Sequence, residues 1–127
     1  MTNPFQDQEK FMRACDQSVG YLNTDQYKLY LNLIKEEANE LMDAVIANDE
    51  VEQLDALIDI LVVTVGALHS LGVDGEGAWN EVMRTNFAKI DPATGHVNKR
   101  GDGKILKPQG WEPPNLKPYI KGQHGIS

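Results

Sequence analysis

The sequence has only one cysteine, no long apolar run, and few basic residues before position 84. A single cysteine cannot form an internal disulfide, so we expect a cytoplasmic protein with Cys15 in the core of its first helix. The polar N-terminus from Met1 to Lys10 predicts no signal peptide. The longest apolar stretch, Ile60 to Leu68, is too short to cross a bilayer and predicts no membrane partner.

Charge is divided unevenly along the 127 residues. Residues 1–83 carry 16 Asp or Glu against 4 Lys or Arg, and residues 84–127 carry 3 against 8. An acidic body argues against duplex nucleic acid as a partner and suits a site where carboxylates, a divalent metal and a polyphosphate meet. The length predicts a single domain, 1–127, with a helical body at about 3–90 and a C-terminal arm at about 91–127.

Apolar residues at three- and four-residue steps predict four helices. The third helix is apolar nearly all round, so we expect it to be the central helix or part of a subunit interface. On the fourth helix, the spacing of Trp79 with Val82 and Met83 places Trp79 in the core. The helices are expected at about residues 3–20, 24–47, 50–71 and 74–89.

The last third of the chain lacks helical periodicity and holds five of the six prolines. It predicts an extended, mostly irregular arm anchored by Ile105, Leu106 and Trp111. The predicted fold is an all-α four-helix bundle with this arm. One excessively apolar helix is not easily buried by one chain, so we expect a homo-oligomer, either a homodimer or a dimer of dimers.

Six carboxylates interrupt the apolar stripes of the second and third helices. At 100° per residue, Glu37 points toward the core side, Glu40 borders it, and Glu36 faces solvent or a second metal. Two helices joined by a short break pack antiparallel, so the two acid rows are expected to face each other. The six are Glu36, Glu37, Glu40, Glu52, Asp55 and Asp59.

Several carboxylates in a partly apolar site cannot all stay ionised without a counter-charge. Oxygen-only ligands select Mg²⁺, with Mn²⁺ as a substitute. His69, His96 and His124 are scattered and supply no metal pair. The alternative is an acidic, solvated helix pair with ordinary salt bridges, but the only nearby bases are Lys28 and Lys35.

The motif Glu36-Glu37-x-x-Glu40, followed by Glu52-x-x-Asp55, resembles the metal signature of the all-α nucleoside triphosphate pyrophosphohydrolases, the MazG-like superfamily. This superfamily also includes the dimeric dUTPases and the phosphoribosyl-ATP pyrophosphohydrolases. The interval between the half-motifs is short here, and Asp59 offers an alternative to Asp55 one turn later. Later runs are similar to a compact bacterial or phage branch: Asn86-x-x-Lys89, Asp102-Gly103-Lys104-Ile105-Leu106-Lys107-Pro108 and Gly110-Trp111-x-Pro113-Pro114.

The resemblance implies a Mg²⁺-dependent hydrolase that converts a (d)NTP to the monophosphate and pyrophosphate, in nucleotide-pool control or sanitation. It implies metal ligation by Glu37, Glu40, Glu52 and Asp55, with Asp59 as the alternative to Asp55. Glu36 and Glu37 are the expected catalytic carboxylates, and whichever is free of metal holds or deprotonates the attacking water. The expected substrate-binding residues are Asn86, Lys89, Arg100, Lys104 and Lys107.

Three other functions stay open. One is phosphoribosyl-ATP hydrolysis, against which the tail from Asp102 to Pro114 argues. Another is a helical interaction module that binds a partner through the Ile60–Leu68 face, and the third is a non-catalytic nucleotide sensor. For the arm, the alternative is that its lysines only keep it soluble. Trp111 is expected to pin the arm to the body and not to stack on a base.

Overall fold

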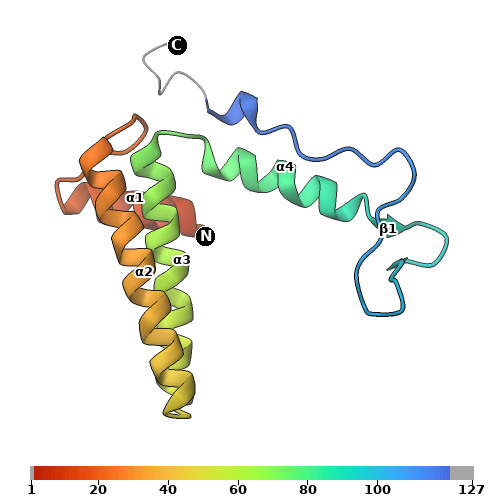
Figure 1. The fold of residues 1–127 in the computed structure, drawn as a ribbon. Coiled ribbons are helices and arrows are strands. Elements are labelled where there is room, and N and C mark those ends of the chain that lie inside the picture. Colours follow the sequence, from red (N-terminus) through yellow and green to blue (C-terminus); the bar gives the residue numbers. More distant parts are fainter. Residues whose placement is uncertain (1, 121–127) are drawn as a thin grey trace. The chain divides into compact units, whose positions relative to one another are not determined.

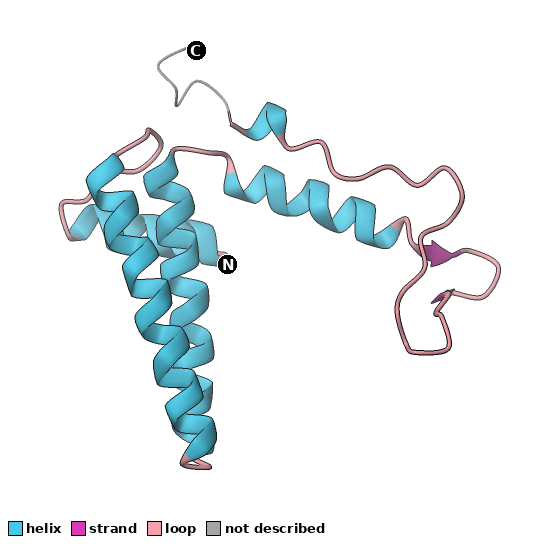
Figure 2. Cartoon of the chain, in the orientation of Figure 1, coloured by secondary structure: helices cyan, strands magenta, loops and turns pink. Residues whose placement is uncertain are grey.

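The computed structural model describes residues 2–120, which contain four helices and almost no strand (Figures 1 and 2). The all-α prediction is confirmed. Residues 121–127, which belong to the expected arm, lie outside the described residues. The elements are α1 (Pro4–Ala14), α2 (Thr24–Ile46), α3 (Glu50–Leu71), α4 (Gly75–Phe87), the antiparallel pair β1 (Ile90–Asp91) and β2 (His96–Val97), and the 3₁₀ turn η1 (Lys117–Tyr119).

Local capping sets the helix boundaries. Asn3 caps α1, because its side-chain oxygen accepts a hydrogen bond from the Gln6 N–H at 2.9 Å. Asp49 caps α3 in the same way by accepting from the Glu52 N–H at 3.1 Å. Gly72 ends α3 with a φ of 82°, a left-handed conformation that glycine adopts without a Cβ clash.

The first helix is shorter than its sequence pattern indicates. It ends at Ala14, and Asp16 follows with a positive φ of 59°. Cys15 is the C-cap and is exposed, so the prediction that it lies in the core is wrong. The chain leaves the helix at this residue, and the loop returns to α3, where the Asn23 N–H donates to the Ser70 carbonyl at 2.9 Å.

The described chain divides into two compact units, residues 2–75 with Ile120 and residues 76–119. This division groups α4 with the arm, whereas the sequence pattern grouped α4 with the helical body. The prediction that Trp79 is a core residue is wrong, because 58% of it is exposed. The buried position on α4 is Thr85, 2% exposed, which helical geometry places on a different face from Trp79.

In the first unit, α2 and α3 form a long antiparallel hairpin and α1 packs against α3 (Figure 1). The core contains Met12 of α1, Tyr30 of α2 and Ala67 of α3. Gly66 lets the helices approach at Tyr30, because a Cβ at Gly66 would lie 2.3 Å from the Tyr30 ring. The third helix therefore contacts both other helices of this unit, as expected of a central helix.

We expect Gly66→Ala to destabilise the protein by about 1–3 kcal/mol, the usual cost of overpacking a core. The added methyl group collides with the Tyr30 ring, which is only 4% exposed and has little room to move. Urea denaturation would measure the change in the free energy of unfolding. Gly101→Ala is the matched control, since nothing lies within 4 Å of its added Cβ; an equal loss in both variants would contradict the packing argument.

One face of α3 is left uncovered by the rest of the described chain. Val51, Leu54, Ile58 and Leu61 are 75%, 62%, 50% and 58% exposed, and they repeat at alternating three- and four-residue steps. That spacing is typical of a coiled-coil contact row. We call these four residues the α3 seam; the row becomes buried at its next position, Val65, which is 7% exposed.

The same helix has the length and composition of a membrane span, with a mean hydropathy of 1.8 and 28% of that window buried within the chain. Core helices of other proteins meet the same criteria. Acidic residues along α3, among them Asp55 and Asp59, would be costly in hydrocarbon.

Candidate functional site

The α2–α3 hairpin brings together acids that are distant in sequence. Glu37 and Asp59 are half-buried, whereas the other members of the two predicted rows are exposed. Glu36 is among the exposed residues, and Glu37 is turned inward, as the helical geometry predicts. The hairpin therefore has an inner pair of carboxylates, one from each helix, with further acids around it.

Glu37 is the most unusual of these groups. Its Oε2 atom is buried and has no hydrogen-bond partner. Burial, followed by the nearby charges of Glu40 and Asp59, raises the pKa of Glu37 to about 7. A buried carboxylate oxygen without a partner is costly, and a neighbouring cation would remove that cost.

The structure distinguishes Asp59 from Asp55. Asp59 is half-buried and is one of the two acids whose charges raise the pKa of Glu37, while Asp55 is exposed. The interval between the two acidic motifs is short, so the residue opposite Glu37 lies one helical turn later in α3. Asp59 is therefore the α3 acid that accompanies Glu37.

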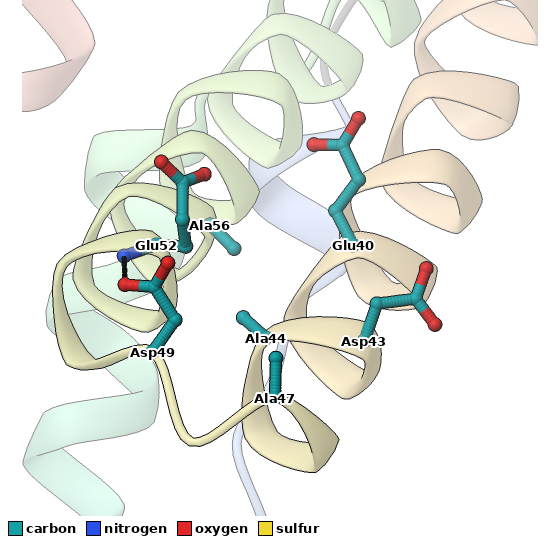
Figure 3. Close-up of a pocket in the computed structure, with 7 residues that line it drawn as sticks. All are labelled: Glu40, Asp43, Ala44, Ala47, Asp49, Glu52 and Ala56. Carbon is teal, nitrogen blue, oxygen red and sulfur yellow. Dashed lines mark hydrogen bonds between the residues drawn. The ribbon is translucent and has the colours of Figure 1, made fainter.

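A second group of acids lines a cavity of about 390 Å³ at the turn end of the hairpin (Figure 3). Glu40 and Glu52 extend from α2 and α3 on the same side of the hairpin, and Glu40 belongs to both acid groups. Sequence reasoning missed Asp43, although it continues the Glu40 row by three residues. It also missed Asp49, whose position suggested only a helix break. The lining residues are Glu40, Asp43, Ala44, Ala47, Asp49, Glu52 and Ala56.

Within residues 2–120, no three acidic, His or Cys side chains are arranged tightly enough to hold a metal ion as they stand. Carboxylates without a counter-charge repel one another, and glutamate side chains can rotate apart on flexible stems. The donor set nevertheless suits a hard cation, since it is made of oxygen atoms and includes the unpartnered Oε2 of Glu37. Glu37, Glu40 and Asp59, with Glu52 nearby, are the residues that could close around one.

We expect the metal-free protein to lose stability as the pH rises from about 4.5 to about 7. In that interval the native state keeps the proton on Glu37, whereas the unfolded chain has released it, so deprotonation favours unfolding. Urea denaturation in EDTA across this range would show the slope. Glu37→Gln should flatten it, and a variant with the wild-type slope would contradict the assignment to Glu37.

The second unit contains the cationic candidates. The Lys89 and Lys107 ammonium groups lie 5.1 Å and 4.7 Å from the centre of the Trp111 ring. Lys89 Nζ also donates to Asn86 Oδ1 at 3.2 Å. The structure therefore brings together three of the five predicted substrate-binding residues, Asn86, Lys89 and Lys107, around a tryptophan that was not among them.

The other two candidates lie in the turn of the arm. Arg100 forms an ion pair with Asp102 at 2.6 Å, and the Asp102 carboxylate also accepts from the Lys104 backbone N–H at 3.1 Å. The turn holds Arg100 in this pair, so binding a phosphate would require it to exchange partners.

Trp111 anchors the arm to α4, as predicted. Its indole N–H donates to the Thr85 carbonyl at 2.7 Å. Ile105 and Leu106 contribute less, because they are 46% and 42% exposed and are held by backbone pairing with the preceding segment of the arm. The anchoring prediction is thus confirmed for Trp111, whereas Ile105 and Leu106 are exposed and pair through their backbone within the arm.

Comparison with known proteins places the hairpin in a family. The chain is 39% identical over 70 residues to an uncharacterized protein of Acanthamoeba polyphaga mimivirus, and the alignment covers 54% of this chain and 28% of that protein. Residues 9–86, which include both acid rows, match the family model described as phosphoribosyl-ATP pyrophosphohydrolase. The chain therefore belongs to the phosphoribosyl-ATP pyrophosphohydrolase family, within the MazG-like superfamily of nucleotide pyrophosphohydrolases.

Proposed function

We propose that this protein is a Mg²⁺-dependent nucleoside triphosphate pyrophosphohydrolase that cleaves (d)NTPs to monophosphates and pyrophosphate. The observation that carries the proposal is the buried, unpartnered Oε2 of Glu37, flanked by Glu40 and Asp59 inside the region that matches the family. An oxygen-only site with a carboxylate in need of a counter-charge is what a Mg²⁺–polyphosphate complex requires.

In this proposal Glu37, Glu40 and Asp59 hold the metal, and Glu52 or Asp55 completes the set. When bound there, Mg²⁺ would supply positive charge that stabilises the negative charge developing on the departing pyrophosphate. Glu36 is exposed on α2, so in this proposal it is the carboxylate that orients or deprotonates the attacking water. Asn86, Lys89, Arg100, Lys104 and Lys107 contact the substrate.

The second candidate function is hydrolysis of phosphoribosyl-ATP, which the description of the matching family favours. The two functions share the phosphoanhydride chemistry and differ in the group attached to the triphosphate. The match ends at Asn86, so the arm, where most of the proposed cationic contacts lie, falls outside it. For this reason we place general (d)NTP hydrolysis first.

A hydrolysis screen over the common NTPs, dNTPs and phosphoribosyl-ATP, with and without Mg²⁺ or Mn²⁺, tests the proposal. Pyrophosphate and orthophosphate are quantified separately. Monophosphate with pyrophosphate, formed only with metal, would support the proposed reaction, and the ranking would identify the substrate. If no nucleotide turns over, the acids form a binding or sensing site and the enzymatic proposal fails.

We also propose that a second copy of this chain covers the α3 seam. The four seam residues are at least half exposed and follow the spacing by which identical helices pack together. Burying what they expose would contribute roughly 4–7 kcal/mol per protomer, at about 1.5–3 kcal/mol for each fully buried side chain. The proposed assembly is a homodimer or a dimer of dimers built on α3.

A further inference from the structure

Trp111 holds two positive charges over one aromatic ring. Lys89, just after α4, and Lys107, in the arm, place their ammonium groups 5.1 Å and 4.7 Å from the ring centre. Both distances are within the range of a cation–π interaction. The two ammonium groups therefore lie no more than about 10 Å apart, which is on the scale of the Debye length in physiological salt.

The tryptophan itself is fixed in place. Its indole N–H bonds to the carbonyl of Thr85, the most buried residue of α4. A few residues later the Asn115 N–H donates to Glu81 at 2.8 Å, and Arg84 pairs with the same carboxylate at 2.8 Å. The Arg84 side chain and the Asn115 N–H lower the pKa of Glu81 to about 2. Glu81 therefore stays ionised and keeps its contacts with Arg84 and Asn115 throughout the physiological pH range.

Neither lysine has an acidic partner among residues 2–120. Among the described residues, neither ammonium group lies within ion-pair distance of a carboxylate, although the whole chain has a net charge of −7. The unit that contains them, residues 76–119, has seven Lys or Arg residues against five Asp or Glu residues. Two like charges held close together without a counter-ion repel, and a polyvalent anion would relieve that repulsion.

We propose that Lys89, Lys107 and Trp111 form one polyphosphate-binding unit, in which Trp111 is a positioning residue that aligns the two ammonium groups. The inference rests on the proposed function for its choice of a nucleotide triphosphate chain as the natural ligand. Holding both lysines on the ring before binding lowers the conformational entropy lost when the anion arrives. A ligand with several linked phosphates can contact both ammonium groups at once, whereas a single phosphate contacts them less completely.

The arrangement also indicates which ligand group the unit does not bind. Two ammonium groups lie over the Trp111 ring and its N–H bonds to Thr85, so a base that stacked on a face covered by a lysine would have to displace that ammonium group. The unit is therefore expected to bind phosphates without preference for the base. Preference among nucleotides has to come from other residues.

The test uses the full chain without metal, in the Trp79→Phe background, so that Trp111 is the one remaining tryptophan. Its fluorescence is titrated with inorganic tripolyphosphate in EDTA, and orthophosphate and sulfate are titrated for comparison. We expect a saturable change with tripolyphosphate at a concentration at least tenfold lower than with orthophosphate. An absent change, or equal concentrations for both anions, would overturn the proposal.

Alanine variants distinguish anion binding by this unit from non-specific attraction to surface lysines. Lys89→Ala and Lys107→Ala should each weaken tripolyphosphate binding about fivefold or more, and the double variant should remove the saturable change. Lys117→Ala, which removes an exposed lysine of the same unit, is the matched control and should bind like the parent protein. If Lys117→Ala weakens binding as much as the other two, the attraction is non-specific and the proposal is wrong.

Calorimetry tests the positioning role, because it does not need the fluorescent ring. Trp111→Leu keeps both lysines but loses the ring, so its affinity for tripolyphosphate should fall about as much as in a single lysine variant. Trp111→Phe should recover part of that loss by restoring an aromatic face. Wild-type affinity in Trp111→Leu would rule out a positioning role, and circular dichroism checks that each variant remains folded.

This result is independent of turnover. If the protein binds tripolyphosphate through the two lysines but hydrolyses no nucleotide, the binding proposal is supported and the enzymatic proposal is wrong. If the protein does not bind tripolyphosphate and the double lysine variant hydrolyses nucleotides as well as the wild type, the enzymatic proposal is supported and the binding proposal is wrong.

Discussion

Glu37→Gln is expected to lower kcat/KM for nucleotide hydrolysis at least a hundredfold, a loss of about 2.7 kcal/mol or more in transition-state stabilisation. The substitution keeps the shape of the side chain and removes the charge that the proposed metal needs. The variant should fold, because the native carboxylate has a buried oxygen without a partner and its own charge is unfavourable there. The measurement is pyrophosphate release at varied Mg²⁺ concentrations.

Two further measurements test whether the loss of activity comes from the loss of a metal ligand at Glu37. Glu50→Gln removes an exposed acid in the first turn of α3, outside both acid groups, and should keep wild-type activity. Mg²⁺ should raise the melting temperature of the wild-type protein and of Glu50→Gln, but not that of Glu37→Gln. If Glu37→Gln retains both its activity and its response to Mg²⁺, the metal assignment is incorrect.

The same assay compares the two α3 acids. Asp59 acts on Glu37 and is half-buried, whereas Asp55 is exposed, so Asp59→Asn should reduce activity more than Asp55→Asn. The literal sequence motif favours the opposite order. A larger loss in Asp55→Asn would mean that the metal-bound hairpin has a different register from the metal-free one.

A charge in the α3 seam is expected to dissociate the assembly. By light scattering, the wild-type protein should have the mass of at least two chains of 14.2 kDa. The double variant Leu54→Asp/Leu61→Asp should have the mass of one chain. Burying an uncompensated carboxylate in an apolar interface costs several kcal/mol, which is comparable to what the seam contributes. Both positions are more than half exposed in the single chain, so the substitutions should leave the fold of each chain intact.

Ile46→Asp is the matched control for this experiment. Ile46 is the last residue of α2 and is 82% exposed. It is apolar like Leu54 and Leu61 and more accessible than either, but it does not belong to the α3 seam. The control should keep the wild-type mass. A wild-type protein that is already a single chain in solution would exclude the assembly, and dissociation of the Ile46→Asp variant would place the interface elsewhere.

Periodicity and capping predicted the long helices well, because α2 and α3 owe their boundaries to nearby residues such as Asp49 and Gly72. Errors occurred where the outcome depends on packing between distant segments. The end of α1 and the exposure of Cys15 follow from a loop that bonds to the end of α3, where Asn23 donates to Ser70, 47 residues later. Trp79 had the spacing of a core residue, but the buried face of α4 is the one that carries Thr85.

For the site, helical geometry predicted that Glu37 turns inward and that the two acid rows face each other in an antiparallel helix pair. It did not determine the register between the helices, which depends on how the hairpin turns and on the contact between Gly66 and Tyr30. For that reason Asp59 could not be distinguished from Asp55. The sequence distinguishes Lys89 and Lys107 only by their charge and motif, and the folded arm brings both ammonium groups over one ring.

The α2–α3 hairpin also has a kinetic consequence. Its two helices are consecutive in the chain and are joined by a turn of three residues, so most contacts around the acids form between segments that are close in sequence. Structures dominated by such local contacts fold within microseconds to milliseconds. The carboxylates should therefore converge early during folding, before the arm has docked on α4, and a stopped-flow experiment should detect the hairpin helices before the environment of Trp111 changes.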